Sequence, residues 1–163
     1  RSQLKEIIQR QLFDYLHTLG VKNLVGVPDS TMKHFIDQGL KKNKILIATR
    51  EEEAIGIAVG MSLSKNHTLV FMQNAGLANS ISTITSLVQL YQIPLIFLVG
   101  WRGYLQNDAP EHKKIGEIQS DILKLIGLKS KIVKDDNWKS CCKWALKQIS
   151  NGSSCCLVIQ RLF

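Results

Sequence analysis

The segment NHTLVFMQNAGLANSISTITSLVQLYQIPLIFLVGW, residues 66–101, contains no Asp, Glu, Lys or Arg. Within it, two apolar runs at residues 68–72 and 95–99 flank a helical pattern over residues 77–91. A strand, a helix and a second strand in this order predict a crossover unit with two parallel strands in one sheet. Because the unit carries no charge, we expect it to be covered on nearly every side, by its own domain or by a partner subunit.

The same alternation continues on both sides of this unit. We expect strands at residues 23–27, 45–49, 68–72, 95–99, 131–133 and 155–159, and helices at residues 4–19, 31–40, 52–64, 77–91, 118–126 and 138–149. Six strands that alternate with helices predict an α/β fold, with a six-stranded, mostly parallel sheet and helices on both faces. The length of 163 residues suits a single domain over residues 1–163.

Composition excludes several classes of protein. With 45% hydrophobic and 21% charged residues, the chain is expected to be soluble and globular rather than disordered. No apolar run approaches the roughly 20 residues that cross a bilayer, so we expect no membrane association. The net charge of +8 is carried mostly by residues 113–163. The lysines there lack regularly interleaved aromatic residues, so we expect a solvated face and no nucleic-acid partner.

The four cysteines form two adjacent pairs, Cys141-Cys142 and Cys155-Cys156. Neither pair has the CxxC spacing of a zinc site, so we expect small buried side chains and no metal bound by this chain. Residues 1–163 contain no signal-peptide pattern, so the cytoplasm is the expected compartment, with a removed leader or a trimmed N-terminus as the alternatives.

Polar residues follow four of the predicted strands. In a parallel sheet the carboxyl ends of the strands share one edge, where ligand-binding groups collect. The residues expected at this edge are Pro28-Asp29-Ser30, Thr49 to Glu53, Gln73 to Gly76, and the loop from Trp101 to His112.

Three carboxylates, Glu51, Glu52 and Glu53, lie where the second strand turns into a helix. Carboxylates are favourable at a helix N-terminus, so capping is one interpretation of all three. The helix continues almost wholly apolar through AIGIAVGM, residues 54–61, so it is expected to pack closely on several sides and to carry its first carboxylate into a covered space. A carboxyl group placed there suits proton transfer. His112 is either a solvated loop histidine or a catalytic group on the same edge.

The predicted helix over residues 77–91 has an apolar and a polar face, neither of them charged. The apolar face is expected to hold Ile81, Ile84, Leu87, Val88 and Tyr91, and the polar face Ser80, Thr83 and Ser86. We interpret the uncharged polar face as a contact between two subunits.

Five motifs in order carry a resemblance to a known family. They are GVPDS (26–30), TREEEAIGIAVG (49–60), MQNAGLANSI (72–81), YQIPLIFLVGWRG (91–103) and PEH (110–112). Together they resemble the pyrimidine-binding domain of thiamine diphosphate-dependent 2-oxoacid decarboxylases, in particular those that act on sulfopyruvate and phosphonopyruvate. The resemblance covers nearly the whole chain and implies the thiamine diphosphate-binding fold.

The resemblance also implies roles for particular residues. Glu51 lies nine positions before Gly60 and matches the glutamate that hydrogen-bonds N1′ of the cofactor's aminopyrimidine. The other matches are Pro28, Gln73, Asn74 and Gly76 beside the cofactor, Ser30 at the substrate, and His112 for substrate binding or proton transfer. Arg102 is expected to bind a doubly charged substrate, because a guanidinium binds oxyanions bidentately. Glu111 departs from the family pattern and would repel a substrate anion, so the substrate stays open.

In this family the diphosphate and its Mg²⁺ are bound by a second domain with a GDGS motif and a later Asn, and residues 1–163 contain no such motif. We therefore expect activity only with a diphosphate-binding beta subunit or domain, and a homodimeric contact in addition. The alternatives are an acetolactate-type carboligase subunit and a non-catalytic relic that serves as an interaction module.

Overall fold

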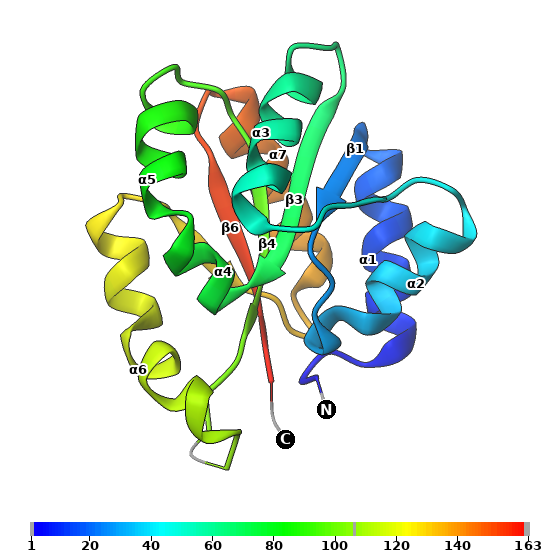
Figure 1. The fold of residues 1–163 in the computed structure, drawn as a ribbon. Helices are drawn as coiled ribbons and strands as arrows, with labels where there is room; N and C mark the ends of the chain where they lie inside the picture. The colour runs from blue at the N-terminus through cyan, green and yellow to red at the C-terminus, as the bar shows by residue number, and fades with distance from the viewer. Residues whose placement is uncertain (1, 106, 162–163) are drawn as a thin grey trace.

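The computed structural model describes residues 2–105 and 107–161. Its strands form one sheet in the order β2-β1-β3-β4-β6-β5, and all of the pairings between them are parallel (Figure 1). The strands are β1 (Val21–Gly26), β2 (Leu46–Ile47), β3 (His67–Gln73), β4 (Ile96–Trp101), β5 (Ser130–Ile132) and β6 (Cys155–Gln160). The predicted six-stranded α/β fold is confirmed.

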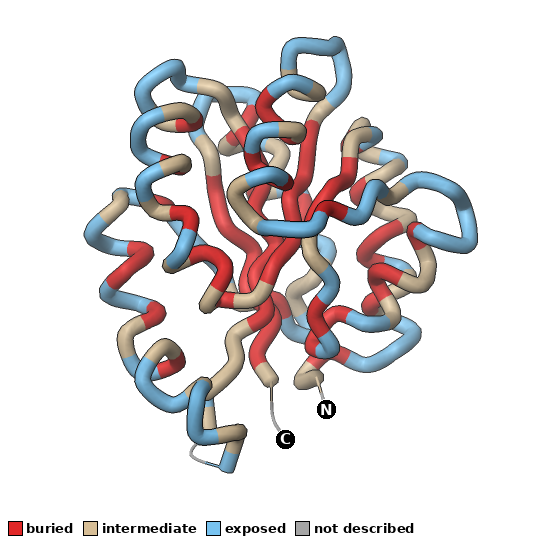
Figure 2. The backbone as a smooth tube through the Cα atoms, viewed as in Figure 1, coloured by how far each residue is buried: buried red, intermediate tan, exposed pale blue. Residues whose placement is uncertain are grey.

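Helices cover both faces of this sheet. The α-helices are α1 (Glu6–Thr18), α2 (Lys33–Lys41), α3 (Glu51–Ser62), α4 (Asn74–Asn79), α5 (Ile81–Thr83), α6 (Pro110–Leu125) and α7 (Trp138–Ser150), with a 3₁₀ turn η1 (Ser30–Met32) and a π-helical segment η2 (Ile84–Gln89). Side chains of α1, α2 and α7 share one buried cluster with one face of the sheet, and those of α3, α4, η2 and α6 share a second cluster with the other. The central strands between them are buried along their length (Figure 2).

Two predicted elements differ in extent. The strand expected over residues 45–49 is reduced to the two exposed residues of β2, which pairs only with β1 at the edge of the sheet. The helix expected over residues 118–126 begins earlier, because Pro110 occupies its first turn, where a fixed φ and a missing N–H are tolerated. The first turns of α6 are polar and have no apolar periodicity. The apolar spacing therefore predicted only the second half of this helix.

The helix expected over residues 77–91 is divided into α4, α5 and η2. In its last part the Leu90 N–H donates to the Thr85 carbonyl at 3.2 Å, which is the i to i−5 spacing of a π-helix. This winding rotates later side chains away from the α-helical pattern, and Tyr91 is exposed rather than on the apolar face. Ser80 is buried rather than on a polar outer face, because its hydroxyl donates to the Gly76 carbonyl at 2.7 Å. The predicted faces were therefore wrong at these two positions.

The uncharged segment is covered only in part. Strands β3 and β4 are buried as expected, but Ser82, Ser86 and Leu90 are exposed on the outside of α5 and η2. On the adjacent helix α3, Gly56 and Gly60 are also exposed, and a Cβ at either position would meet nothing within 4 Å among the described residues. The outer face of these helices is thus not packed within the chain.

The four cysteines are free thiols and all are buried, as predicted. Burial raises the pKa of the Cys142 and Cys155 thiols to about 12. Among the described residues, no group of three His, Cys, Asp or Glu side chains is arranged to hold a metal ion. None of the described helices combines the length and the apolar character needed to cross a membrane.

Candidate active site

The Glu51 side chain lies in a space left by a glycine. Glu51 is the first residue of α3 and is half-buried, while Gly76 is buried in α4 after β3. A Cβ on Gly76 would lie 2.6 Å from Glu51 Oε1 and still closer to Cγ. No side chain could therefore replace Gly76 without moving the carboxylate. The contact brings together two residues that were predicted to face the cofactor.

The neighbouring carboxylates of Glu52 and Glu53 have polar partners at the start of α3. Glu53 Oε1 accepts a hydrogen bond from the Thr49 N–H at 3.2 Å, which satisfies a donor at the helix entry. Glu52 Oε2 lies 3.7 Å from Arg50 Nε in an ion pair. Capping and pairing thus account for Glu52 and Glu53, and Glu51 is the carboxylate that packs against a neighbouring element.

Asn74 joins the carboxyl ends of two strands. Its side chain is fully buried, its amide nitrogen donates to the Arg102 carbonyl at 2.9 Å, and its amide oxygen accepts from the Arg102 N–H at 3.2 Å. Both ends of the amide are therefore bonded to the backbone that follows β4. Of the other residues predicted to border the cofactor, Gln73 is half-buried at the end of β3 and Pro28 is exposed after β1.

Arg102 is enclosed by two carboxylates. Its guanidinium lies 3.4 Å from Asp29 Oδ1 and 3.3 Å from Asp108 Oδ2, and its side chain is only 14% exposed. Asp108 also accepts hydrogen bonds from the N–H groups of Gly103 and Ala109, both at 2.8 Å. This cluster ties the loops after β1 and β4 together. The sequence pattern alone did not indicate the part played by both aspartates, although both lie in the loops expected at the carboxyl edge.

The contacts within this cluster shift the pKa values of Asp108 and Arg102. Burial alone would raise the pKa of the Asp108 carboxyl, but the hydrogen bonds from Arg102 and from two backbone N–H groups hold that pKa well below its ordinary value. Burial alone would lower the pKa of Arg102, and the bond to Asp108 and both carboxylate charges raise it instead. Asp108 and Arg102 are therefore an ion pair at neutral pH.

Ser30 lies beside Arg161, an arginine that was not among the predicted site residues. The Arg161 guanidinium, at the end of β6, donates to Ser30 Oγ at 3.0 Å and lies 4.0 Å from Asp108 Oδ1. The turn η1 brings Ser30 to this place from the end of β1. The same reasoning about carboxyl ends, applied to the sixth strand, would have found Arg161.

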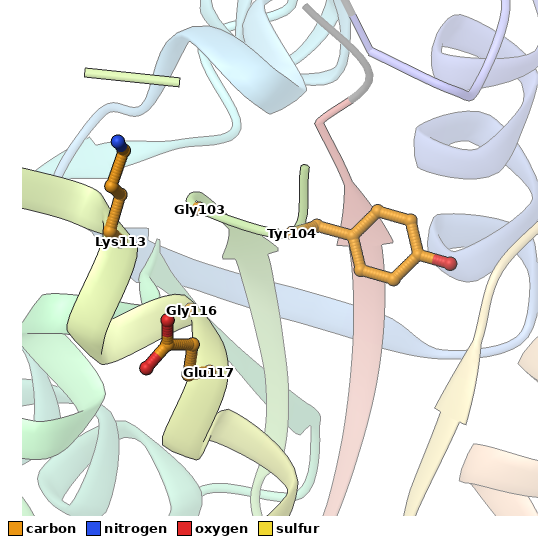
Figure 3. A pocket seen from close by; sticks show the side chains of 5 residues that line it. All are labelled: Gly103, Tyr104, Lys113, Gly116 and Glu117. Carbon is orange, nitrogen blue, oxygen red and sulfur yellow. The ribbon is translucent and has the colours of Figure 1, made fainter. Parts of the chain in front are cut away.

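His112 lies in the first turn of α6 and is half-buried. The helix approaches the loop closely here, since Gly103 has φ +73° and a Cβ on it would overlap the His112 carbonyl. Next to this contact is a cavity of about 420 Å³, lined by Gly103, Tyr104, Lys113, Gly116 and Glu117 (Figure 3). In Figure 3 the Tyr104 ring points away from the Lys113 and Glu117 side chains, and the cavity includes none of the predicted site residues.

A family model for the thiamine pyrophosphate enzyme N-terminal TPP binding domain matches residues 8–125. The chain belongs to this family. Its expected thiamine diphosphate-binding fold is therefore confirmed.

Two curated relatives of this TPP-binding domain carry names that describe an activity. The chain is 33% identical over 108 residues to sulfopyruvate decarboxylase subunit alpha of Methanocaldococcus jannaschii, covering 64% of this chain and 63% of the relative. It is 32% identical over 120 residues to phosphonopyruvate decarboxylase of Streptomyces viridochromogenes, covering 72% of this chain and 30% of the relative. The match thus spans less than two thirds of either relative.

Solved structures share the fold at lower identity. Benzoylformate decarboxylase from Polynucleobacter necessarius matches with a TM-score of 0.70 and 22% identity, covering 92% of this chain and 29% of that chain. The 2-oxoglutarate:ferredoxin oxidoreductase from Magnetococcus marinus matches with a TM-score of 0.70 and 13% identity, covering 93% and 28%. At these identities the likeness shows the fold alone.

The residues at the sheet edge fit the aminopyrimidine end of thiamine pyrophosphate. A ring nitrogen needs a hydrogen-bonding partner at a partly covered position, and Glu51 presents a half-buried carboxylate there. Gly76 leaves the space that this carboxylate occupies, which a Cβ would fill. The second group of contacts, formed by Ser30, Arg102, Asp108 and Arg161, lies at the same edge around the ends of β4 and β6.

Proposed function

We propose that this TPP-binding domain is the pyrimidine-binding subunit or domain of a carboxy-lyase, a thiamine diphosphate-dependent decarboxylase of sulfopyruvate or phosphonopyruvate. The observation that carries the proposal is the Glu51 carboxylate held against Gly76 at the carboxyl edge of the sheet. The names of the matched relatives support the substrate class. Thiamine diphosphate, when bound, supplies the electron sink for loss of carbon dioxide.

In this proposal, Glu51 hydrogen-bonds N1′ of the aminopyrimidine and holds a proton there. Gly76 keeps the carboxylate in position, and Gln73 and Pro28 border the ring. Asn74 acts on the loop rather than on the cofactor, because both ends of its amide are bonded to the Arg102 backbone.

Arg102 is reassigned from substrate binding to loop positioning. Its guanidinium lies between Asp29 and Asp108, and a substrate anion would have to displace a carboxylate to reach it. Ser30 and His112 keep their predicted roles at the substrate, with His112 as a candidate for proton transfer. Both lie at the carboxyl edge of the sheet, on η1 and on the first turn of α6.

The proposal includes a partner that binds the diphosphate and Mg²⁺. It is supported by the relatives named as subunit alpha. The outer face of α5 and η2, which carries no charged residue, suits the contact with that partner or with a second copy of the chain. The four free thiols fit a reducing compartment such as the cytoplasm, which stays a prediction.

The test is to co-express the chain with a polypeptide that carries the GDGS motif and the later Asn. The purified complex is assayed with thiamine diphosphate, Mg²⁺ and either sulfopyruvate or phosphonopyruvate, and each protein is assayed alone as the control. We expect carbon dioxide and the corresponding aldehyde from the complex only. Carboligated products would support the acetolactate-type alternative, and a complex without any activity would support an interaction module.

A further inference from the structure

A small cavity lies at the amino edge of the sheet, the edge opposite the candidate active site. β2 pairs with Val25 and Gly26 at the end of β1, and the earlier residues of β1 border the cavity. The loop between α2 and β2 and a residue near the end of α3 also line it. The cavity has a volume of about 230 Å³, and its lining is Lys22, Asn23, Leu24, Asn43, Lys44, Ile45, Leu46 and Met61.

Lys22 and Lys44 supply the charge of this lining. Both are exposed, and no Asp or Glu is among the described residues that line the cavity. Within the part of the chain that the structure describes, neither ammonium group lies within 4.0 Å of a carboxylate oxygen. Lys22 Nζ donates to His17 Nδ1 at 3.1 Å, and this neutral partner leaves the lysine its charge and two further N–H donors. Both ammonium groups can therefore donate to an anion in the cavity.

Asp14, a carboxylate next to this group of lysines, is already paired. Its Oδ1 lies 2.6 Å from Lys42 Nζ, so it does not neutralise the two lysines of the cavity. The pKa of His17 reflects the remaining positive charge. Burial lowers that pKa most, and the charges of Lys22, Lys44 and Lys42 lower it further, against the opposing charge of Asp14. Positive charge from separate elements thus converges at this edge of the sheet.

We propose that Lys22 and Lys44 form a binding site for a phosphoryl dianion at the amino edge of the sheet. The site is separate from the candidate active site and does not depend on the proposed function. The two ammonium groups come from β1 and from the loop before β2, and together they match an anion that carries two charges. Lysine binds phosphate as a point charge, without the planar geometry that an arginine requires.

The apolar part of the lining indicates what the phosphoryl group carries. Leu46 is 45% exposed on the edge strand β2, and the half-buried Ile45 and Met61 line the same cavity. The Asn23 amide nitrogen already donates to the Met61 carbonyl and the Thr68 hydroxyl, at 3.1 and 3.2 Å. A phosphate monoester with a short apolar stem would bury the apolar surface, whereas free phosphate would contact the lysines alone. The two sources of the phosphoryl group are therefore expected to differ in affinity.

The test is isothermal titration calorimetry of the chain with inorganic phosphate and with n-butyl phosphate. Both probes are dianions at about pH 8, and NaCl keeps the ionic strength constant. Lys22→Gln and Lys44→Gln should each weaken the binding of both probes at least fivefold, because each removes one of the two charges that face the anion. Lys41→Gln is the matched control, since it removes the charge of an exposed residue of α2 outside the lining, and binding should stay within twofold. Circular dichroism checks that each variant is folded.

The comparison of the two probes identifies the source of the phosphoryl group. We expect n-butyl phosphate to bind at least threefold more tightly than inorganic phosphate, and Leu46→Asn to remove that difference. Equal affinities of the two probes in the wild type, with both still sensitive to Lys22→Gln and Lys44→Gln, would support the lysine site and assign it to free phosphate.

A second measurement locates the bound anion in the wild-type chain. The ring signals of His17, which bonds to Lys22, should shift in proton NMR spectra as phosphate is added, and those of His112 at the opposite edge should not. Three results would each overturn the inference: no binding of either probe, binding that is insensitive to both lysine substitutions, or a loss in Lys41→Gln as large as that in Lys22→Gln. A shift of His112 in place of His17 would also overturn it. None of these results bears on decarboxylation, so the proposed function is tested separately.

Discussion

At the scale of single residues, Gly76 determines where the Glu51 carboxylate lies. The family resemblance, through the spacing to Gly60, pointed to Glu51 among three consecutive glutamates, and in the structure the Glu51 side chain contacts Gly76 of α4. The contact itself could not be predicted from the sequence, because it depends on how α3 and α4 lie on the sheet. From sequence alone, a glycine within a helix only weakens the helical pattern. It does not show which neighbouring side chain needs the space.

Gly76→Ala tests this contact in the isolated chain. The added Cβ overlaps Cγ, Cδ and Oε1 of Glu51, so this side chain has to leave its position. We expect the free energy of unfolding to fall by about 1–3 kcal/mol, as for other overpacked sites. Gly56→Ala is the matched control, since its Cβ meets nothing within 4 Å among the described residues and alanine favours a helix by roughly 0.5–1 kcal/mol. Urea unfolding measures both, and equal effects of the two variants would contradict the contact.

At the scale of elements, the loops after β1, β3 and β4 are tied into one unit by Asn74, Arg102 and two aspartates. The sequence predicted that these loops share an edge, since parallel strands place their carboxyl ends together. It did not predict the bonds between them. Arg102 was therefore predicted to bind the substrate, whereas its buried partners, Asp29 and Asp108, show that it holds the loops together.

Asp108→Asn should weaken this unit in a pH-dependent way. The folded-state pKa of Asp108 lies below its ordinary value of 3.8, so the carboxylate stabilises the fold above about pH 4 and this stabilisation is lost as pH falls through the folded-state pKa. At pH 7 we expect a loss of about 1.5–3 kcal/mol of unfolding free energy, the range for hydrogen bonds to charged groups. The difference from wild type should shrink progressively below about pH 4.

The control for this variant is Glu117→Gln on α6. Glu117 is 67% exposed and lies 3.8 Å from Lys114, so we expect a change within about 0.5 kcal/mol at pH 7. Denaturant unfolding at a series of pH values measures both variants. A pH-independent effect of Asp108→Asn would show that the ion pair with Arg102 is not what holds the loops.

The order of elements was largely predictable and their winding was not. Alternating apolar runs and helical patterns gave all six strands, because a parallel sheet covered by helices repeats one unit. Tyr91 was expected on the apolar face but is exposed, because the prediction assumed the period of an α-helix and η2 is π-helical. The start of α6 was missed because its first turns are polar and exposed.

At the scale of the whole molecule, the outer face of α5 and η2 carries no charged residue and is exposed in the described chain. The absence of charge in residues 66–101 predicted that this segment is covered on nearly every side. In the structure its strands are covered by the chain's own helices, but the outer side of those helices is exposed. The remaining coverage is assigned to the proposed partner or second copy. Much of the net charge lies elsewhere in the sequence, in residues 113–163.

Ser86→Arg tests that assignment. Ser86 is exposed on η2, so an arginine there should change the unfolding free energy of the isolated chain by no more than about 0.5 kcal/mol. In a contact between subunits it would bury an unpaired charge, so we expect association with the partner chain to be lost. Ser140→Arg is the control, because Ser140 is an exposed residue of α7, which lies on the opposite face of the sheet. Light scattering reads out the assembly, and an intact complex with Ser86→Arg would place the contact elsewhere.

The most direct test of the central claim is the effect of Glu51→Gln on decarboxylation by the co-expressed complex. The substitution keeps the shape beside Gly76 and removes the proton-transferring group, so we predict a fall in kcat of at least about 100-fold with folding and assembly unchanged. Glu52→Gln, whose carboxylate pairs with Arg50, should stay within about threefold of wild type. A Glu51→Gln complex that decarboxylates as fast as wild type would contradict the account.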